Sequence, residues 1–276
     1  MTLSSCSRRM LTTLSVLAML HSISVNAQTA PKTPPTLKAL EQQGVHFVAD
    51  TLPAPRGMKG WASYHGQQPL AFYVTGDGNV IMGTLLDSEG EDMTSKPLQD
   101  TVQAAMMDGI WKQVQKSHWV AEGSPSAPRT LYVFTDPNCP YCTQLWSETQ
   151  PWVKAGKVQI RHILVGILTK TSPGKAAAIL ASANPGKALT AHETAYFEAR
   201  QKQAADGRKI DPDGQGIAPL DRVPANISQQ LEENTRMMLQ LDLQATPALI
   251  WRDAYGAVHI RQGVPQGDLK KIMGPI

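Results

Sequence analysis

Two cysteines separated by two residues, Cys139 and Cys142, are the side chains of this chain most suited to chemistry. They follow a predicted strand over 129–135 and the turn Asp136-Pro137-Asn138, and they open a predicted helix that ends at Pro151. If Asn138 caps this helix, Cys139 lies in its first turn. Unpaired backbone N–H groups there favour a thiolate over a thiol, and dithiols in this setting have pKa values of about 3.5–7.

The two thiols therefore have different predicted roles. Cys139 is predicted to be the nucleophile, because a lowered pKa makes a thiol both reactive and a good leaving group. Pro140 suits the first helical turn, where a missing N–H costs little, and Tyr141 completes the motif. Cys142 is one turn further into the helix and is predicted to be the resolving thiol.

A cysteine pair has two other common uses, a zinc site and a structural disulfide. A zinc site needs four ligands, and the chain has no second Cys pair and only scattered histidines, so no metal is predicted. A structural disulfide between residues so close in sequence would close a very small loop and add little stability. The spacing favours a redox-active pair that needs no other cofactor.

Thr246-Pro247, just before a predicted strand over 248–251, is the second candidate element. Proline at a strand start gives up a ladder donor. A cis bond would present the Thr246 backbone to whatever docks beside the dithiol. Only about 5–6% of X–Pro bonds are cis, but the dithiol upstream, with a strand and helices between, makes cis the prediction here, with Thr246 and Pro247 as substrate-binding residues.

The first 27 residues are typical of a secretory signal peptide. Arg8 and Arg9 precede a short apolar run that ends at Leu20, and 25–27 has the small-x-small form of a cleavage site near Ala27. The run is too short to span a bilayer, which needs roughly 20 residues. We therefore expect an exported protein, and Cys6 leaves with the leader.

The charge balance argues against nucleic acid as a partner. The chain has 26 basic and 23 acidic residues, a formal charge of +3. Because the leader holds two arginines and no acid, the exported part is nearly neutral. No dense run of Lys and Arg marks a nucleic-acid interface.

The rest of the chain divides into two predicted units. After a loose tether from Gln28, a helix near 36–43, strands from 45 and 58, and a hairpin over 70–86 form a small α+β unit within 28–95. A unit of this size buries a limited core, and oligomerisation is one usual remedy. A linker helix follows, with Val102, Met106, Ile110 and Val114 at helical spacing, within a linker range of 96–122.

The second unit, 123–276, alternates strands and helices. Strands are predicted at 129–135, 158–168, 248–251 and 257–260, and helices at 139–151, 174–183, 187–205, 226 onward (Asn226 with Gln229 as a capping box) and 266–273. This order fits an α/β domain with a central mixed sheet.

Several other motifs are explained without a special function. His192-Glu193 lacks the second His of a zinc-protease helix, and the Asp211 to Gly214 run lacks the ligand series of a calcium loop. Asn226-Ile227-Ser228 is better explained as a helix cap than as a glycosylation site. The methionines at 106, 107, 237 and 238 fit core or groove lining. Asp136 is expected to oppose ionisation of Cys139 by its charge.

The run from Phe134 to Cys142, with Thr246-Pro247 downstream, resembles the thioredoxin-fold Dsb proteins, and within them the DsbC/DsbG family of thiol:disulfide interchange proteins. Cys-Pro-Tyr-Cys separates the chain from the DsbC branch, which carries Cys-Gly-Tyr-Cys. Further matching blocks lie at 57–60, 115–120, 151–153, 156–158, 164–166, 176–182 and 223–226. The resemblance covers nearly the whole exported chain, although the loop near 201–222 looks longer than the family pattern.

The resemblance implies an N-terminal cystatin-like dimerisation domain, a linker helix and a C-terminal thioredoxin-fold domain with a helical insertion. It implies a V-shaped homodimer in the periplasm whose dithiol is kept reduced by the membrane reductase DsbD. Its substrates would be periplasmic proteins with wrong disulfides or with cysteines oxidised to sulfenic acid.

The sequence is also compatible with two other functions. The chain could be a periplasmic chaperone that holds unfolded clients and uses its dithiol only secondarily. It could also be a donor oxidase, whose dithiol would be found oxidised in the cell. The N-terminal dimerisation unit argues against the oxidase, because dimerisation would hide the dithiol from an oxidising partner.

Overall fold

The computed structural model describes residues 32–209, 211, 213–263 and 267–276. The predicted leader over 1–27, its cleavage point and the first residues of the tether lie outside this range. Of the helices in the described ranges, none combines the length and the apolar character needed to cross a membrane.

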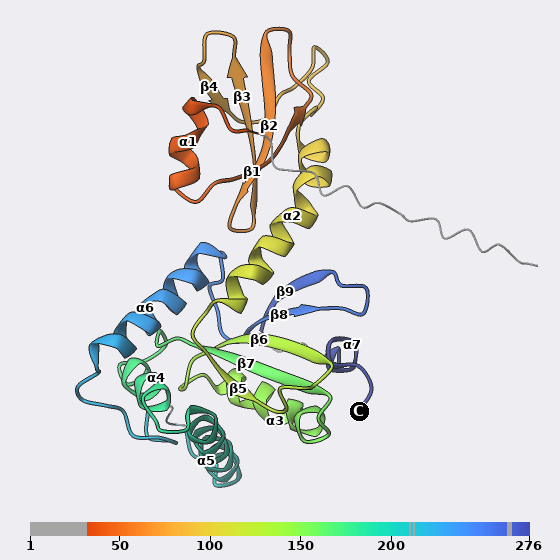
Figure 1. Cartoon of the computed structure of the whole chain (residues 1–276). Helices are drawn as coiled ribbons and strands as arrows, with labels where there is room; N and C mark the ends of the chain where they lie inside the picture. Colours follow the sequence, from red (N-terminus) through yellow and green to blue (C-terminus); the bar gives the residue numbers. More distant parts are fainter. Residues whose placement is uncertain (1–31, 210, 212, 264–266) are drawn as a thin grey trace, which may run out of the picture. The chain divides into compact units, whose positions relative to one another are not determined.

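The N-terminal unit is a helix beside a four-stranded antiparallel sheet (Figure 1). Its elements are α1 (Pro35–Gln42), β1 (His46–Leu52), β2 (Met58–His65), β3 (Gln68–Thr75) and β4 (Val80–Met82), and the sheet order is β1-β2-β3-β4. Large apolar side chains on one face of the sheet, Phe47, Trp61 and Phe72, pack with Leu37 of α1 in one buried cluster. β4 is shorter than the predicted strand over 80–86 and leaves one edge of the sheet without a partner strand.

A long helix, α2 (Ser95–Gln115), follows this sheet. Its buried residues are Leu98, Val102, Met106, Ile110 and Val114, so the predicted helical spacing is confirmed. The predicted linker range of 96–122 extends past the helix, because β5 (Trp119–Glu122) is a strand of the C-terminal sheet.

The C-terminal sheet has five strands in the order β5-β7-β6-β8-β9. The remaining strands are β6 (Arg129–Thr135), β7 (Val158–Leu164), β8 (Ala248–Arg252) and β9 (Val258–Gln262). β6 and β7 are parallel, and every other pair is antiparallel. The predicted mixed sheet, and with it the α+β fold class, is confirmed.

Side chains of β6 point alternately to the two faces of this sheet. Leu131 and Val133 pack with Leu145 and Trp152 of α3 (Pro140–Lys154). Tyr132 and Phe134 point to the opposite face and join a separate buried cluster. Because both faces are covered, β6 is apolar from Leu131 to Phe134, as buried central strands are. The dithiol follows its carboxyl end.

Three helices form an insertion between β7 and β8 (Figure 1). They are α4 (Ser172–Leu180), α5 (Pro185–Ala205) and α6 (Ala225–Gln240); α7 (Leu269–Met273) closes the chain. The long segment 206–224 that joins α5 to α6 has no helix or strand among its described residues.

Some predicted element ends were wrong. Pro151 lies inside α3 and does not end it, because only one helical hydrogen bond is lost in its last turn. β7 stops at Leu164, four residues early. Asn226 lies in the first turn of α6 and makes no cap, since Pro224 occupies the cap position. Of the predicted last helix, Gln266 lies outside the described residues.

Candidate functional site

Cys139 is the N-cap residue of α3, a position that was predicted for Asn138. Its backbone is extended, with φ −82° and ψ 112°, and Pro140 begins the helix. The Cys142 backbone N–H donates a hydrogen bond to the Cys139 sulfur at 3.3 Å. The nucleophile therefore occupies the place where a helix usually carries a Ser, Thr, Asp or Asn oxygen, and the sulfur takes over the capping role.

This environment makes Cys139 acidic. A hydrogen bond from the Cys142 side chain lowers the pKa of the Cys139 thiol to about 7, with the backbone N–H groups of Cys142 and Tyr141 acting in the same direction against the effect of burial. A thiol with a pKa near ambient pH combines a large thiolate fraction with high nucleophilicity.

Cys142 has the opposite character. It is buried, and burial together with the neighbouring Cys139 raises the pKa of its thiol well above the usual value. The two sulfurs are not joined, so the structure shows the dithiol form. One thiol is thus ready to ionise while the other holds its proton, the asymmetry required of a nucleophile and a resolving thiol.

The Thr246–Pro247 peptide bond is cis, which agrees with the prediction. The Cys139 thiol donates a hydrogen bond to the Thr246 carbonyl oxygen at 3.3 Å. The preceding backbone is held by Gln262 of β9, whose Oε1 accepts from the N–H groups of Gln244 at 2.7 Å and Ala245 at 3.0 Å. The structure thus brings Thr246 and Pro247 beside the dithiol.

Asp136, whose charge was expected to oppose ionisation of Cys139, is held by four hydrogen bonds. Its carboxylate accepts from the Asn138 N–H (2.8 Å), the Ser172 hydroxyl (2.8 Å) and the N–H groups of Ile167 (2.7 Å) and Leu168 (3.0 Å). With four donors on two oxygens, Asp136 is a buried structural acceptor that fixes the turn before the dithiol.

Side chains of α4 and α5 hold the same turn. His192 Nε2 donates to the Pro137 carbonyl at 2.7 Å, and the Tyr196 hydroxyl donates to the Asn138 carbonyl at 3.1 Å. Lys175 Nζ donates to Asn138 Oδ1 at 2.8 Å. The helical insertion therefore fixes both carbonyl groups that immediately precede Cys139.

The segment 206–224 is tied to this turn as well. Asp213 accepts from Asn138 Nδ2 at 3.3 Å, and Lys175 Nζ donates to the Gln215 carbonyl at 2.7 Å. The Ile217 N–H donates to His192 Nδ1 at 3.0 Å. Since Nδ1 accepts, the proton of the His192 ring lies on Nε2, and burial lowers the pKa of this ring to about 4.

Exposed apolar side chains lie around the dithiol. Tyr141, between the two cysteines, is 61% exposed, and Ile167 and Leu168, whose backbones bind Asp136, are 43% and 48% exposed. Beside α3, a groove of about 220 Å³ is lined by Gln144, Phe197, Arg200, Gln201 and Ala204. The exposed side chains of Tyr141, Ile167 and Leu168 thus offer apolar contacts to a polypeptide.

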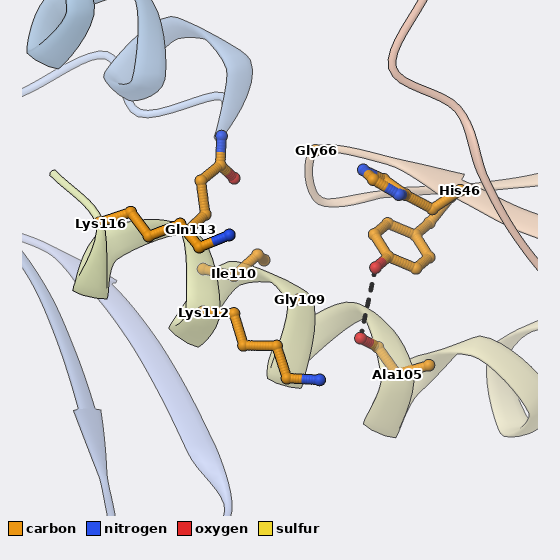
Figure 2. A pocket seen from close by; sticks show the side chains of 9 residues that line it. His46, Gly66, Ala105, Gly109, Ile110, Lys112, Gln113 and Lys116 are labelled. Carbon is orange, nitrogen blue, oxygen red and sulfur yellow. Dashed lines mark hydrogen bonds between the residues drawn. The ribbon is translucent and has the colours of Figure 1, made fainter. Parts of the chain in front are cut away.

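A second pocket, of about 490 Å³, lies between the N-terminal sheet and α2 (Figure 2). His46 and Tyr64 stack there with ring centres 5.0 Å apart, and the Tyr64 hydroxyl approaches the Ala105 carbonyl at 3.4 Å. A Cβ at Gly109 would come within 2.4 Å of that hydroxyl, which explains a glycine inside a helix. The pocket has no cysteine in its lining, so it is separate from the thiol chemistry.

Sequence reasoning missed several residues around the dithiol. The sequence predicted no role at the dithiol for His192 and Glu193, whose pairing lacks a second zinc ligand, nor for Lys175, Tyr196 and Thr143. A partial signal existed: 192, 193 and 196 form a polar set at helical spacing in a segment otherwise assigned as an ordinary helix. Among the described residues, no group of three or more His, Cys, Asp or Glu side chains could hold a metal ion.

Known proteins share similarity with the C-terminal part of this chain. Residues 114–255 match the family model described as Thioredoxin. Among solved structures, a periplasmic thioredoxin-like protein from Salmonella enterica serovar Typhimurium gives a TM-score of 0.43 at 20% identity, covering 59% of this chain and 92% of that one. The catalytic domain of Proteus mirabilis ScsC gives 0.43 at 18% identity, with the same coverage.

Two relatives in sequence cover nearly the whole chain. The thiol:disulfide interchange protein DsbG of Pseudomonas aeruginosa is 38% identical over 251 residues, which are 90% of this chain and 91% of the relative. The DsbG of Escherichia coli K12 is 34% identical over 271 residues, 96% and 99% of the two chains. A chain that carries the asymmetric dithiol and is this similar to both proteins along its length belongs to the DsbG family of thiol:disulfide interchange proteins.

Proposed function

We propose that this thiol-disulfide oxidoreductase works in the periplasm as a reductant and isomerase of protein disulfides, with Cys139 as nucleophile and Cys142 as resolving thiol. One observation carries the assignment: the Cys139 sulfur caps α3, has a pKa lowered to about 7, and lies at the Thr246 backbone. Membership of the DsbG family and the predicted signal peptide support the location.

The first step is attack of the Cys139 thiolate on a sulfur atom of the substrate. With a disulfide, a new S–S bond forms between Cys139 and one substrate sulfur while the other leaves as a thiolate. With a sulfenic acid, the same attack expels the oxygen, which takes up a proton and leaves as water. Both routes give the same mixed disulfide.

The mixed disulfide has two exits. In isomerisation, another substrate thiolate attacks the substrate sulfur and releases Cys139 as a thiolate, so no electrons are consumed overall. In reduction, Cys142 attacks Cys139, the substrate leaves as a thiolate, and the pair is left oxidised. We infer that the membrane reductase DsbD then returns the oxidised pair to the dithiol.

Substrate binding is assigned to the backbone at Thr246 and to the apolar residues near the dithiol. The Thr246 carbonyl, 3.3 Å from the Cys139 sulfur, is placed to pair with an extended substrate segment in the manner of an added strand. Pro140 and Tyr141 shape the approach, and no tightly bound cofactor enters the scheme.

We infer a homodimer assembled through the N-terminal unit. β4 is an edge strand whose side chains Val80, Ile81 and Met82 are 37%, 49% and 64% exposed. An apolar edge strand exposed to water is a site for pairing with another chain, and a second copy of the chain would cover it.

The assignment is tested by trapping substrates in the periplasm. A Cys142→Ala variant lacks the resolving thiol, so its mixed disulfides with substrates persist and are separable on non-reducing gels. The matched Cys139→Ala variant, with Cys142 intact, is expected to trap none. Equal trapping by the two variants, or trapping by neither, would contradict the assignment of Cys139.

A chaperone activity is the second candidate function, and the exposed side chains of Tyr141, Ile167 and Leu168 favour it. Such a surface binds unfolded clients without any thiol chemistry. If this function is primary, a protein with both cysteines replaced by alanine suppresses aggregation of a cysteine-free client as well as the parent does. Loss of suppression in that variant would assign client binding to the dithiol instead.

A further inference from the structure

Three carboxyl groups are buried in the C-terminal unit: Asp136 in the turn before the dithiol, Glu122 on β5, and Glu193 on α5. They differ in how their oxygens are used. Asp136 accepts four hydrogen bonds, as described above. The Oε1 atom of Glu122 accepts from side chains of Trp146, Gln150 and Thr190, and its Oε2 atom faces the His162 ring at 3.4 Å. Neither group has a free oxygen.

Glu193 differs from these two groups. It is 0% exposed, and its Oε2 accepts a hydrogen bond from the Thr143 hydroxyl at 2.6 Å. Its Oε1 has no hydrogen-bond partner among the described residues. A buried carboxyl oxygen without a donor is costly, and such an atom beside reactive thiols calls for a chemical reason.

Glu193 is bound to the helix that carries the resolving thiol. α5 packs against α3 (Figure 1), and Thr143, which binds Glu193, directly follows Cys142 in the chain. The Glu193 carboxyl interacts electrostatically with both cysteines. Cys142 is 3% exposed, so a proton leaving its thiol has no direct route to water.

The resolving step requires that proton to leave. Cys142 must become a thiolate to attack the Cys139 sulfur of the mixed disulfide, because the thiol itself is a poor nucleophile. We propose, on the basis of the function proposed above, that the Glu193 carboxylate accepts the proton of the Cys142 thiol as Cys142 attacks. The S–S bond between Cys139 and Cys142 forms, the bond to the substrate breaks, the substrate leaves as a thiolate, and Glu193 becomes a carboxylic acid.

The charges around Glu193 couple this proton transfer to the reaction. Burial raises the pKa of Glu193 to about 8, and the charges of Glu122, Cys139 and Asp136 act in the same direction, against the Thr143 hydrogen bond. Tyr196 on α5 interacts with the same carboxyl. When Cys139 enters a mixed disulfide its negative charge disappears, which favours the carboxylate of Glu193 at the stage that needs a proton acceptor.

The same group serves the return reaction. When a reductant thiolate attacks Cys139 of the oxidised pair, Cys142 is the leaving group, and a buried thiolate without a proton is unfavourable. The Glu193 carboxylic acid donates its proton to Cys142 and returns to the carboxylate, which restores the starting number of protons. Acid and base roles thus alternate in one residue.

A two-step release experiment separates attack from resolution. The reduced protein is mixed with a symmetric aromatic disulfide, 5,5′-dithiobis(2-nitrobenzoate), and release of the coloured thiolate is followed by stopped flow. The first equivalent reports attack by Cys139 and the second reports resolution by Cys142. Because general acid–base groups contribute about 10²–10⁴-fold, Glu193→Gln is expected to raise the ratio of the first to the second rate constant by roughly 10²-fold.

Two further variants make this result specific. Glu198→Gln changes an exposed glutamate of the same helix and serves as the matched control, with the parent ratio expected. Thr143→Val keeps the Glu193 carboxyl but removes the hydrogen bond that lowers the pKa of Glu193. The pH profile of the second phase should therefore shift to higher pH. A merely structural role of Glu193 would not produce this shift.

The outcomes distinguish the two proposals. An unchanged ratio in Glu193→Gln, or an unshifted profile in Thr143→Val, overturns the role of Glu193 while leaving the function intact. Absence of the first phase in the parent protein would instead contradict Cys139 as the nucleophile. If Glu193→Gln fails to fold, the pH profile of Thr143→Val decides alone.

Discussion

The Cys139 sulfur lies 3.3 Å from the carbonyl oxygen of Thr246, although 107 positions of the chain separate the two residues. The contact joins the start of α3 to the start of β8. β6 leads into α3 and also pairs with β8, with Phe134 opposite Ala248. The register of two buried strands therefore determines which backbone faces the dithiol, and a one-residue slip would remove the contact.

The acidity of Cys139 is expected to depend on Cys142. The hydrogen bond from the Cys142 thiol is the largest cause of the lowered pKa, so Cys142→Ala should raise the pKa of Cys139 from about 7 towards that of an ordinary thiol. The measurement is a pH titration of thiolate ultraviolet absorbance in the reduced proteins. Cys142→Ser, which retains a donor, is the matched control and should titrate near the parent; an alanine variant that titrates like the parent would contradict this account.

Gln262 is expected to support the Thr246 backbone from a distance. Its Oε1 accepts two backbone N–H groups of the segment before Thr246, so Gln262→Ala leaves both without this acceptor and should cost about 1–2 kcal/mol in free energy of unfolding. Reduction of a protein disulfide should slow more than reduction of a small disulfide, because only the protein pairs with the Thr246 backbone.

The comparison variant is Gln262→Glu, which keeps an acceptor oxygen in the same place. Denaturant unfolding and the ratio of the two reduction rates are measured for both variants. If the glutamate and alanine variants lose the same free energy of unfolding and the same rate of protein-disulfide reduction, the acceptor oxygen of Gln262 is not the cause.

The sequence was sufficient for the parts of the site that are local. A strand, a turn and Pro140 at the first helical position place Cys139 at a helix start within one short segment. The cap assignment missed by one residue, because the side-chain oxygen of Asn138 is not the acceptor used; its Nδ2 instead donates to Thr169, Thr171 and Asp213. The sulfur of Cys139 then becomes the cap.

The surroundings of the dithiol could not be predicted in the same way. His192, Glu193 and Tyr196 reach it from a helix that starts 46 positions after Cys139. Their role depends on how α5 packs against α3, which neither residue spacing nor composition specifies. Likewise Asp136 was expected to perturb Cys139 by charge, and only the tertiary structure shows the four donors that occupy its oxygens.

His192 is expected to make the protein sensitive to acid. The ring is neutral, donates to the Pro137 carbonyl and accepts from the Ile217 N–H, and burial lowers its pKa from 6.5 to about 4. As pH falls through this window the unfolded chain binds the proton before the folded protein does, so stability decreases. At about 1.4 kcal/mol per unit the loss is roughly 3 kcal/mol.

The comparison that isolates this effect is between the parent and His192→Gln, which can still donate to Pro137 but does not titrate. Free energies of unfolding are measured in denaturant at several pH values between 6.5 and 4. The difference between the two proteins should change by roughly 3 kcal/mol in favour of the variant as pH falls. If the unfolding free energies of the two proteins change with pH in parallel, His192 is not the cause of the loss of stability in acid.

Assembly through the β4 edge is the last expectation. Ile81 is 49% exposed on a three-residue strand that pairs only with β3, so Ile81→Lys should add a charge to an interface between copies without disturbing the core of the N-terminal unit. Inward-pointing or edge lysines are the means by which natural sheets block such pairing. Light scattering after gel filtration should show dimers for the parent and monomers for the variant.

The control variant is Lys38→Glu on α1, which changes an exposed charge away from this edge and should remain dimeric. Because the dithiol lies in the other unit, the monomeric variant should still reduce a small disulfide. If Ile81→Lys stays dimeric, the interface lies elsewhere. If the variant loses reduction of the small disulfide, the activity of the dithiol depends on the N-terminal unit.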